Sequence, residues 1–270
     1  MTAKVKFQPA NAKLKRLREL MAQEYGRKPY IYGFSMPAGY SCPFAKNCLS
    51  KADRETGKLT DGPDMEFRCF QASLEAIYGT MRDANWRNFE ALRRCKTVED
   101  MVDILQDALP KNADIVRFGI DGDFFNQRFF DATMELARMN PAVRFYAYTK
   151  SLGYWVARIN DIPSNFNLTA SYGGKLDHLI NEYGLKYAKV ILHPSAADGL
   201  EIDHDESHAL NGLASFALLI HGQQAKGSKA SQAIKRLKAE DIEYSYSAAR
   251  DKGSKASQAI KTKAILASQG

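Results

Sequence analysis

The chain has 270 residues, of which 45% are hydrophobic and 26% are charged, and its formal net charge is +7. This length and composition suit a globular protein with a substantial core, and no apolar run approaches the roughly 18 residues that a membrane span needs. The N-terminus lacks the apolar segment of a secretory signal, so we expect a soluble cytoplasmic protein without a membrane partner.

The positive charge is concentrated at the two ends of the chain. Residues 1–30 and 226–270 each carry a net charge of +6, whereas residues 31–225 carry −5. The central body is therefore not expected to attract nucleic acid, although the ends could contact phosphate groups without reading a base sequence. Solvated tails would explain the same charge.

The first half of the chain predicts helices on either side of one strand and a long loop. Residues 10–25 have the spacing of an amphipathic helix, with Leu14, Leu17, Leu20 and Met21 on one side. Residues 30–35 read as a short strand that opens into a loop rich in Pro and Gly, and residues 65–108 read as two helices. The break between these helices is expected near Lys96 and Thr97, where Thr97 can cap the second.

Beyond Pro110, short apolar runs alternate with helical segments. The further strands are expected at 115–120, 143–148, 166–170, 189–192 and 216–220, and the helices at 126–139, 151–159 and 174–184. This alternation predicts an α/β fold with a parallel sheet of six strands. The strand count fits an open doubly wound sheet or an incomplete (β/α)6 barrel, and periodicity does not separate the two.

The C-terminal segment contains an internal repeat. The sequence KGSKASQAIK at residues 226–235 recurs at 252–261. Each copy could form a capped helix with an N-terminus suited to phosphate, or the repeat could be a duplication within a solvent-exposed tail. We expect one α/β domain at residues 1–240 and a basic tail at 241–270.

Three of the four cysteines lie between the first strand and the helices that follow. Thiolate sulfur is a soft ligand, and in a reducing cytoplasm Cys42, Cys48 and Cys69 favour an iron–sulfur or zinc centre over a disulfide. Their spacing is not the C-x2-C pattern of structural zinc, so an iron–sulfur centre is preferred. Cys95 could be a fourth ligand or a small core residue on the helix face of Trp86.

Polar residues follow nearly every predicted strand. They are Asp121, Asp123, Lys150, Ser171, His193 and His221. Because the carboxyl ends of parallel strands form the functional site in such folds, we expect these residues to bind substrate. Asp123 could instead cap the next helix, and Lys150 could be solvated.

One further cluster carries metal-binding or proton-transfer residue types. It comprises Asp203, His204, Asp205 and His208, of which the two histidines would stand one turn apart on a helix. A solvated acidic loop is the preferred interpretation. No Walker loop, HExxH or G-x-S-x-G motif is present, so common kinase and hydrolase mechanisms have no support, and the catalytic residues are unknown.

Taken together, an ordered series of motifs resembles the bacteriophage gene-product-88 family over residues 30–235. The motifs are CPFAKNC at 42–48, CFQA at 69–72, FGIDGDF at 118–124, YAYTKS at 146–151, LTAS at 168–171, LEIDH at 200–204 and FALLIHG at 216–222. The resemblance implies a virus-encoded protein of the host cytoplasm. Its cysteine loop resembles that of radical S-adenosylmethionine proteins, which carry a [4Fe-4S] cluster after the first strand of a partial (β/α)6 barrel.

The cysteine spacing departs from the radical-enzyme motif, because C-x3-C-x2-C is absent. Three cysteine ligands would leave one iron open to substrate or S-adenosylmethionine, whereas Cys95 as a fourth ligand would close the cluster. The leading hypothesis is a [4Fe-4S] protein that performs redox or radical chemistry on an unknown substrate with an electron donor. The alternative is a binding module in which the metal only holds the N-terminal loops together. Such a module would bind nucleic acid or a partner protein through its basic ends.

Overall fold

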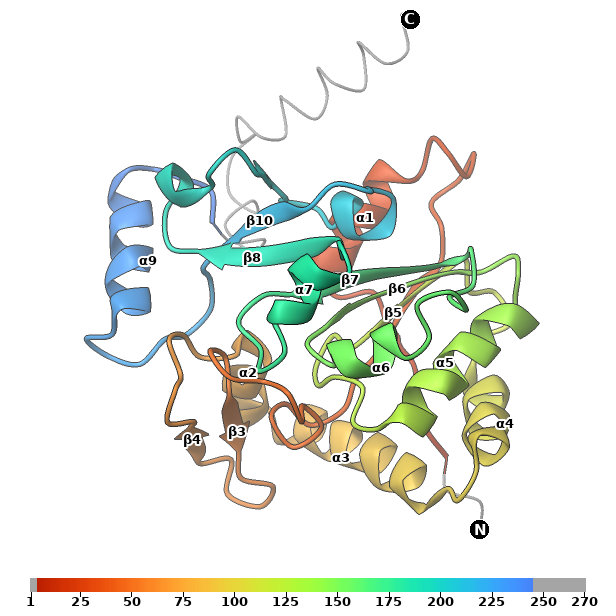
Figure 1. The fold of residues 1–270 in the computed structure, drawn as a ribbon. Coiled ribbons are helices and arrows are strands. Elements are labelled where there is room, and N and C mark those ends of the chain that lie inside the picture. The colour runs from red at the N-terminus through yellow and green to blue at the C-terminus, as the bar shows by residue number, and fades with distance from the viewer. Residues whose placement is uncertain (1–3, 245–270) are drawn as a thin grey trace, which may run out of the picture.

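The computed structural model describes residues 4–244, and they form a mixed α/β fold around one mostly parallel sheet (Figure 1). The order of its eight strands is β1-β2-β5-β6-β7-β8-β10-β9. Only β1 runs antiparallel to its neighbour. The strands are β1 (Gln8–Pro9), β2 (Ile31–Phe34), β5 (Ile115–Phe118), β6 (Arg144–Thr149), β7 (Phe166–Ser171), β8 (Tyr187–Ile191), β9 (Glu201–Ile202) and β10 (Phe216–Leu219).

The strands β2, β5, β6, β7 and β8 lie side by side in the order in which they occur along the chain. A doubly wound sheet would reverse this order at a switch point, so that alternative is wrong for this chain. The sheet does not close into a barrel, because β1 and β9 form its two edges. All six predicted strands are present, and the sequence missed only the two-residue edge strands and a separate hairpin.

That hairpin pairs β3 (Ser50–Ala52) with β4 (Leu59–Asp61) and lies within the long loop after β2. The helices are α1 (Ala12–Leu20), α2 (Phe70–Ile77), α3 (Gly79–Arg94), α4 (Val98–Ala108), α5 (Gln127–Met139), α6 (Leu152–Val156), α7 (His178–Glu182), α8 (Ser207–Leu210) and α9 (Lys229–Ala239). Residues 65–108 thus hold three helices instead of two, because the chain breaks at Tyr78 as well as at Thr97. Thr97 caps α4 as expected.

Helices cover both faces of the sheet. Helices α3 to α7 pack on one face, against side chains such as Phe34, Phe118 and Phe145. The opposite face carries α1 and α8, which contact the alternate strand residues Ile115 and Tyr146. Adjacent residues of one strand therefore contribute to two separate hydrophobic clusters.

The helix predicted near the N-terminus is present, and its cap and apolar face explain why it forms. Asn11 accepts a hydrogen bond from the Leu14 amide at 3.1 Å, which caps α1. Leu14 and Leu17 are completely buried, but Leu20 is 38% exposed. The assignment of Leu20 to the apolar side was therefore wrong.

The first copy of the repeat belongs to the folded body. Ser228 caps α9 by accepting a hydrogen bond from the Ser231 amide, and Ala230 and Leu237 of this helix are fully buried. A solvent-exposed tail is therefore the wrong description for residues 226–235. The second copy at 252–261, and most of the predicted tail, lie outside the described residues.

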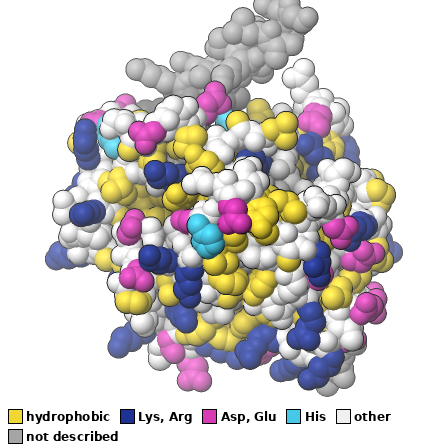
Figure 2. Space-filling view, viewed as in Figure 1, with side chains coloured by type: hydrophobic (Ala, Val, Ile, Leu, Met, Phe, Trp, Pro, Cys, Tyr) yellow, Lys and Arg dark blue, Asp and Glu magenta, His cyan; other side chains and the backbone are white. Residues whose placement is uncertain are grey.

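Within residues 4–244, none of the helices combines the length and apolar character needed to cross a bilayer. Basic and acidic side chains are interspersed over the face shown in Figure 2, with apolar side chains between them.

Candidate metal centre at the carboxyl ends of the strands

The loop that follows β2 lies across the carboxyl ends of neighbouring strands. The Met36 amide donates to the Asp121 carbonyl at 3.0 Å, just beyond β5. Beyond β7, the Asn47 amide donates to the Gly173 carbonyl at 2.9 Å, and the Lys175 amide donates to the Phe44 carbonyl at the same distance. These bonds hold the cysteine-bearing loop over the edge where the predicted polar residues emerge.

Three cysteines from two segments of the loop lie within electrostatic range of one another. Burial is the main cause of the raised pKa of the Cys42 and Cys69 thiols, and the charge of Cys48 adds to the rise in both. Each of the three side chains keeps some exposed surface. In the part of the chain that the structure describes, no set of three or more His, Cys, Asp or Glu side chains converges closely enough to hold a single metal ion.

The Cys42 thiol is held by a tight turn. The Gly39 amide donates to Cys42 Sγ at 3.3 Å. Gly39 has a φ of +73°, and a Cβ there would lie 2.4 Å from the Ser50 carbonyl oxygen, so only glycine fits. Burial raises the pKa of Cys42 well above its usual range, and the charge of Asp123 adds to the effect.

Cys69 lies at the N-terminus of α2. Burial is the main reason that the pKa of its thiol rises to about 12, although the nearby Ala72 and Gln71 amides oppose the rise. These amides lie in the first turn of α2, where they have no intrahelical acceptor, but the Cys69 side chain makes no capping hydrogen bond. The surroundings of both Cys42 and Cys69 therefore disfavour a thiolate, and a bound cation would reverse that preference.

A segment far along the chain fixes the position of Cys69. The Gln224 side chain accepts from the Arg68 amide at 2.7 Å and donates to the Arg68 carbonyl at 3.2 Å. The Phe70 ring lies 5.0 Å from the His221 ring, between centroids. His221 was predicted at this edge and is found beside the start of α2, whereas no local sequence signal pointed to Gln224.

Asp123 is buried, and its carboxylate accepts hydrogen bonds from three donors. Its carboxylate accepts from the Thr149 hydroxyl at 2.6 Å, the Lys150 amide at 2.8 Å and the Phe124 amide at 2.7 Å. It therefore joins the ends of β5 and β6 and does not cap the next helix, because Asn126 caps α5.

Lys150 and Ser171, two of the residues predicted at strand ends, are in contact. The Lys150 ammonium donates to the Ser171 hydroxyl at 2.5 Å, and to the carbonyls of Ser171 and Tyr172 at 3.0 Å. Lys150 is only 7% exposed, so the solvated alternative was wrong. Its contacts join β6 to β7.

Asp121 differs from Asp123 because one of its oxygens has no partner. Its Oδ2 accepts from Asn85 Nδ2 at 2.7 Å, whereas Oδ1 is buried without a hydrogen bond. The side chain is 2% exposed, and burial raises its pKa to about 7. The charge of Asp121 also raises the pKa of Cys69, which places this carboxyl within electrostatic range of the cysteines.

The other predicted site residues lie in different surroundings. His193 contacts the Ser195 hydroxyl and the Glu240 carboxylate, at 2.8 and 2.7 Å, between the end of β8 and α9. Cys95 packs in the core at the end of α3, and the charged groups that act on its pKa are Asp100 and Arg128, not the other cysteines.

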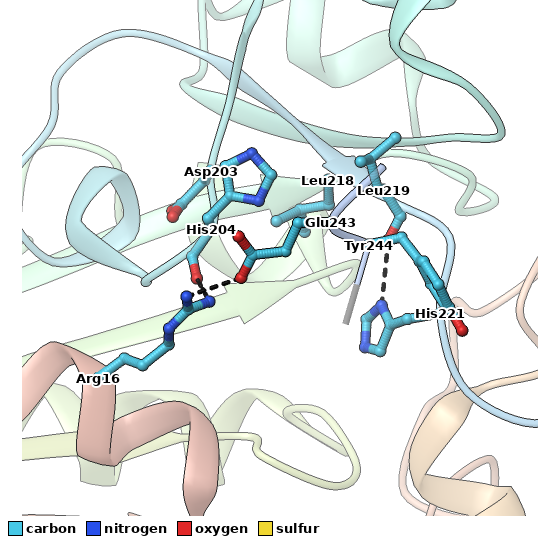
Figure 3. Close-up of a pocket in the computed structure, with 8 residues that line it drawn as sticks. All are labelled: Arg16, Asp203, His204, Leu218, Leu219, His221, Glu243 and Tyr244. Carbon is cyan, nitrogen blue, oxygen red and sulfur yellow. Dashed lines mark hydrogen bonds and ion pairs between the residues drawn. The ribbon is translucent and has the colours of Figure 1, made fainter. Parts of the chain in front are cut away.

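The 201–208 segment is not helical throughout, so the condition that would place the two histidines one turn apart on a helix is not met. Helix α8 begins only at Ser207, so His204 lies in the preceding turn. His208 Nε2 contacts the Glu201 carboxylate at 2.7 Å. His204 lines a small pocket with His221, Glu243 and others, where Arg16 pairs with Glu243 at 2.7 Å (Figure 3).

The fold and this site define an open parallel α/β protein with a cysteine-bearing loop over the strand ends. The chain matches the family model described as gene product 88 over residues 4–240, and it belongs to that family. This confirms the resemblance drawn from the motifs and favours a bacteriophage gene product. No curated protein and no solved structure matches the chain.

Proposed function

We propose that the protein is an iron–sulfur protein in which Cys42, Cys48 and Cys69 hold a [4Fe-4S] cluster that performs redox chemistry on a substrate. The observation that carries the proposal is the loop with Cys42 and Cys48, which is hydrogen-bonded across the carboxyl ends of a parallel sheet, where functional sites gather in such folds. Cys42, Cys48 and Cys69 lie within electrostatic range of one another there. Soft thiolate ligands favour iron–sulfur clusters and zinc over calcium and magnesium.

The donor set fits a cluster better than a single ion. A structural zinc ion needs four ligands that converge on one point, and no such group occurs among residues 4–244. A cluster spreads its irons over a cube, so its ligands stand farther apart. The Gly39 amide, which donates to Cys42 Sγ, also suits a cluster, because hydrogen bonds to ligand sulfurs tune its potential.

Cys95 is not expected to be a ligand. It lies ten positions after Asn85, which contacts Asp121, and a rise over ten positions of helix is about 15 Å. Three thiolates would leave one iron without a protein ligand, where substrate or S-adenosylmethionine can coordinate. The strand order from β2 to β8 suits a partial barrel of the radical-enzyme kind.

The test is anaerobic reconstitution of four single variants. Cys→Ala at 42, 48 or 69 is expected to abolish incorporation of iron and sulfide, because each removes one of three ligands. Cys95→Ala is the matched control and should retain both. Full cluster content in any of the first three variants would overturn the ligand assignment. A change in the electron paramagnetic resonance of the reduced protein on adding S-adenosylmethionine would indicate an open iron.

A second candidate function is binding of nucleic acid through α9. Lys229, Lys235 and Lys238 are all exposed on this helix. Phosphate contacts release counterions, so affinity for a DNA duplex should fall steeply with salt. Replacing the three lysines by glutamate should abolish binding at low salt, and unchanged affinity would exclude this function for α9.

A further inference from the structure

Two acidic side chains are buried together beneath the cysteine-bearing loop. Glu75 of α2 is 0% exposed and Asp121, beyond β5, is 2% exposed. The side-chain amide nitrogen of Asn85 in α3 donates to both, at 2.6 Å to Glu75 Oε1 and at 2.7 Å to Asp121 Oδ2. One amide therefore bridges two carboxyl groups from different elements.

The remaining contacts of this acid pair do not neutralise two negative charges. The Ala38 amide donates to both oxygens of Glu75 at 3.2 Å, and Asp121 Oδ1 has no partner. Among residues 4–244, no ion pair reaches either carboxyl. Arg82 donates to the Glu75 backbone carbonyl, and Arg117 pairs with Glu206.

Two such carboxyls are not expected to be ionised together. Burial opposes each charge, and the charge of one raises the pKa of the other. The pKa of Glu75 rises to about 8, mainly through burial, with Asp121 contributing. The cations that lower these pKa values are Arg82 at Glu75 and Arg117 at Asp121. The pair therefore retains a proton near neutral pH.

The acid pair is structurally linked to the cysteines. Successive amides of one turn, at Ala38 and Gly39, donate to Glu75 and to the Cys42 sulfur respectively. Burial is the main cause of the raised pKa of Cys69, and the charge of Asp121 adds to it. Burial likewise raises the pKa of Tyr40 in the same turn, and the charge of Glu75 adds to that rise. Because charges interact strongly in a buried environment, added negative charge at the cysteine centre would favour protonation of the pair.

We propose that Glu75 and Asp121 form a proton-sharing pair, which takes up one proton from solvent when the cysteine centre accepts one electron from an external one-electron reductant such as dithionite. Reoxidation of the centre transfers the electron to an external one-electron acceptor and releases the proton to solvent. The inference rests on the proposed function, because it requires a redox-active centre at the cysteines. In this arrangement Asn85 is a positioning residue, which holds the two carboxyls at a common donor.

The first experiment measures the midpoint potential of the reconstituted protein between pH 6 and 9, with dithionite as reductant. One proton per electron gives a slope approaching about −59 mV per pH unit, which the wild type should show near neutral pH. Glu75→Gln and Asp121→Asn should flatten the slope. Glu66→Gln, at an exposed acid of the same loop, should retain it. A wild-type potential independent of pH, or an unchanged slope in both pair variants, would overturn the coupling.

A second measurement tests the pair without the cluster. The infrared spectrum of the full-length, iron-free chain at pH 7 should contain the carbonyl band of a neutral carboxyl. The double variant Glu75→Gln, Asp121→Asn should lack the band, and Glu66→Gln should keep it. Absence of the band in the wild type would refute the shared proton. If the wild type has the band but binds no iron, the proposed function fails, and the redox coupling fails with it.

Discussion

Replacing Glu75 by Gln should remove most of the loss of stability that the wild type undergoes between pH 6 and 9. The pKa of Glu75 is raised from 4.5 to about 8 in the folded chain, mainly by burial. A raised acid pKa stabilises the fold fully below the unfolded-state value, and this stabilisation is lost as pH rises through the folded-state value. Each pKa unit corresponds to about 1.4 kcal/mol, so raising the pH from 6 to 9 should cost the wild type about 3 kcal/mol through Glu75.

The assay is urea unfolding of the iron-free chain at several pH values between 6 and 9, followed by circular dichroism. Asp121 acts in the same direction, because its pKa is also raised, and it adds to the wild-type loss. Glu75→Gln should lose far less stability over this range, whereas Glu66→Gln should behave as the wild type. Equal losses in the wild type and Glu75→Gln would refute the assignment of a buried, neutral Glu75.

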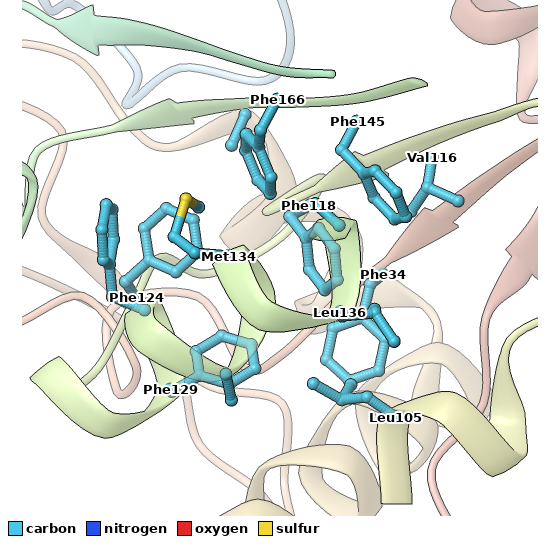
Figure 4. Close-up of a cluster of buried hydrophobic side chains, with 14 of the residues drawn as sticks. Phe34, Leu105, Val116, Phe118, Phe124, Phe129, Met134, Leu136, Phe145 and Phe166 are labelled. Carbon is cyan, nitrogen blue, oxygen red and sulfur yellow. The ribbon is translucent and has the colours of Figure 1, made fainter. Parts of the chain in front are cut away.

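Three other substitutions test the packing and the contacts that position the site. Phe118→Ala should destabilise the fold by about 3–5 kcal/mol in urea unfolding, because this 1% exposed ring packs among other aromatic rings (Figure 4). The control Leu213→Ala, at a 93% exposed residue, should have little effect. Lys150→Met should cost about 1–3 kcal/mol in the same assay by leaving buried acceptors without a donor, and an unchanged unfolding midpoint would contradict that role. Gln224→Ala should accelerate hydrogen exchange at the Arg68 amide, and unaltered protection would show that Gln224 does not hold the Cys69 segment.

The parallel sheet could be predicted because its central strands carry local signals. Runs such as 115–118 and 144–149 are mostly apolar or aromatic and are separated by helical segments, which implies their pairing. The edge strand Gln8–Pro9 has only two residues and no such pattern. The break at Tyr78 escaped prediction because α2 and α3 follow each other almost without a loop.

The candidate site was predictable only where its residues follow strands. Lys150 and Ser171 occupy the ends of adjacent parallel strands, so their meeting follows from the topology. Glu75 and Asn85 lie inside helices, where a polar residue normally faces solvent, and their burial depends on the loop that covers them. Gln224 contacts a residue 156 positions away, and nothing in a single sequence reveals such a pair.

Metal analysis of the wild-type protein, purified without oxygen, tests the central proposal most directly. Iron and acid-labile sulfide should be present at about four of each per chain, with negligible zinc, because a [4Fe-4S] cluster contains four irons and four sulfides. Zinc in stoichiometric amount without labile sulfide, or a chain that takes up neither metal on reconstitution, would contradict the iron–sulfur assignment.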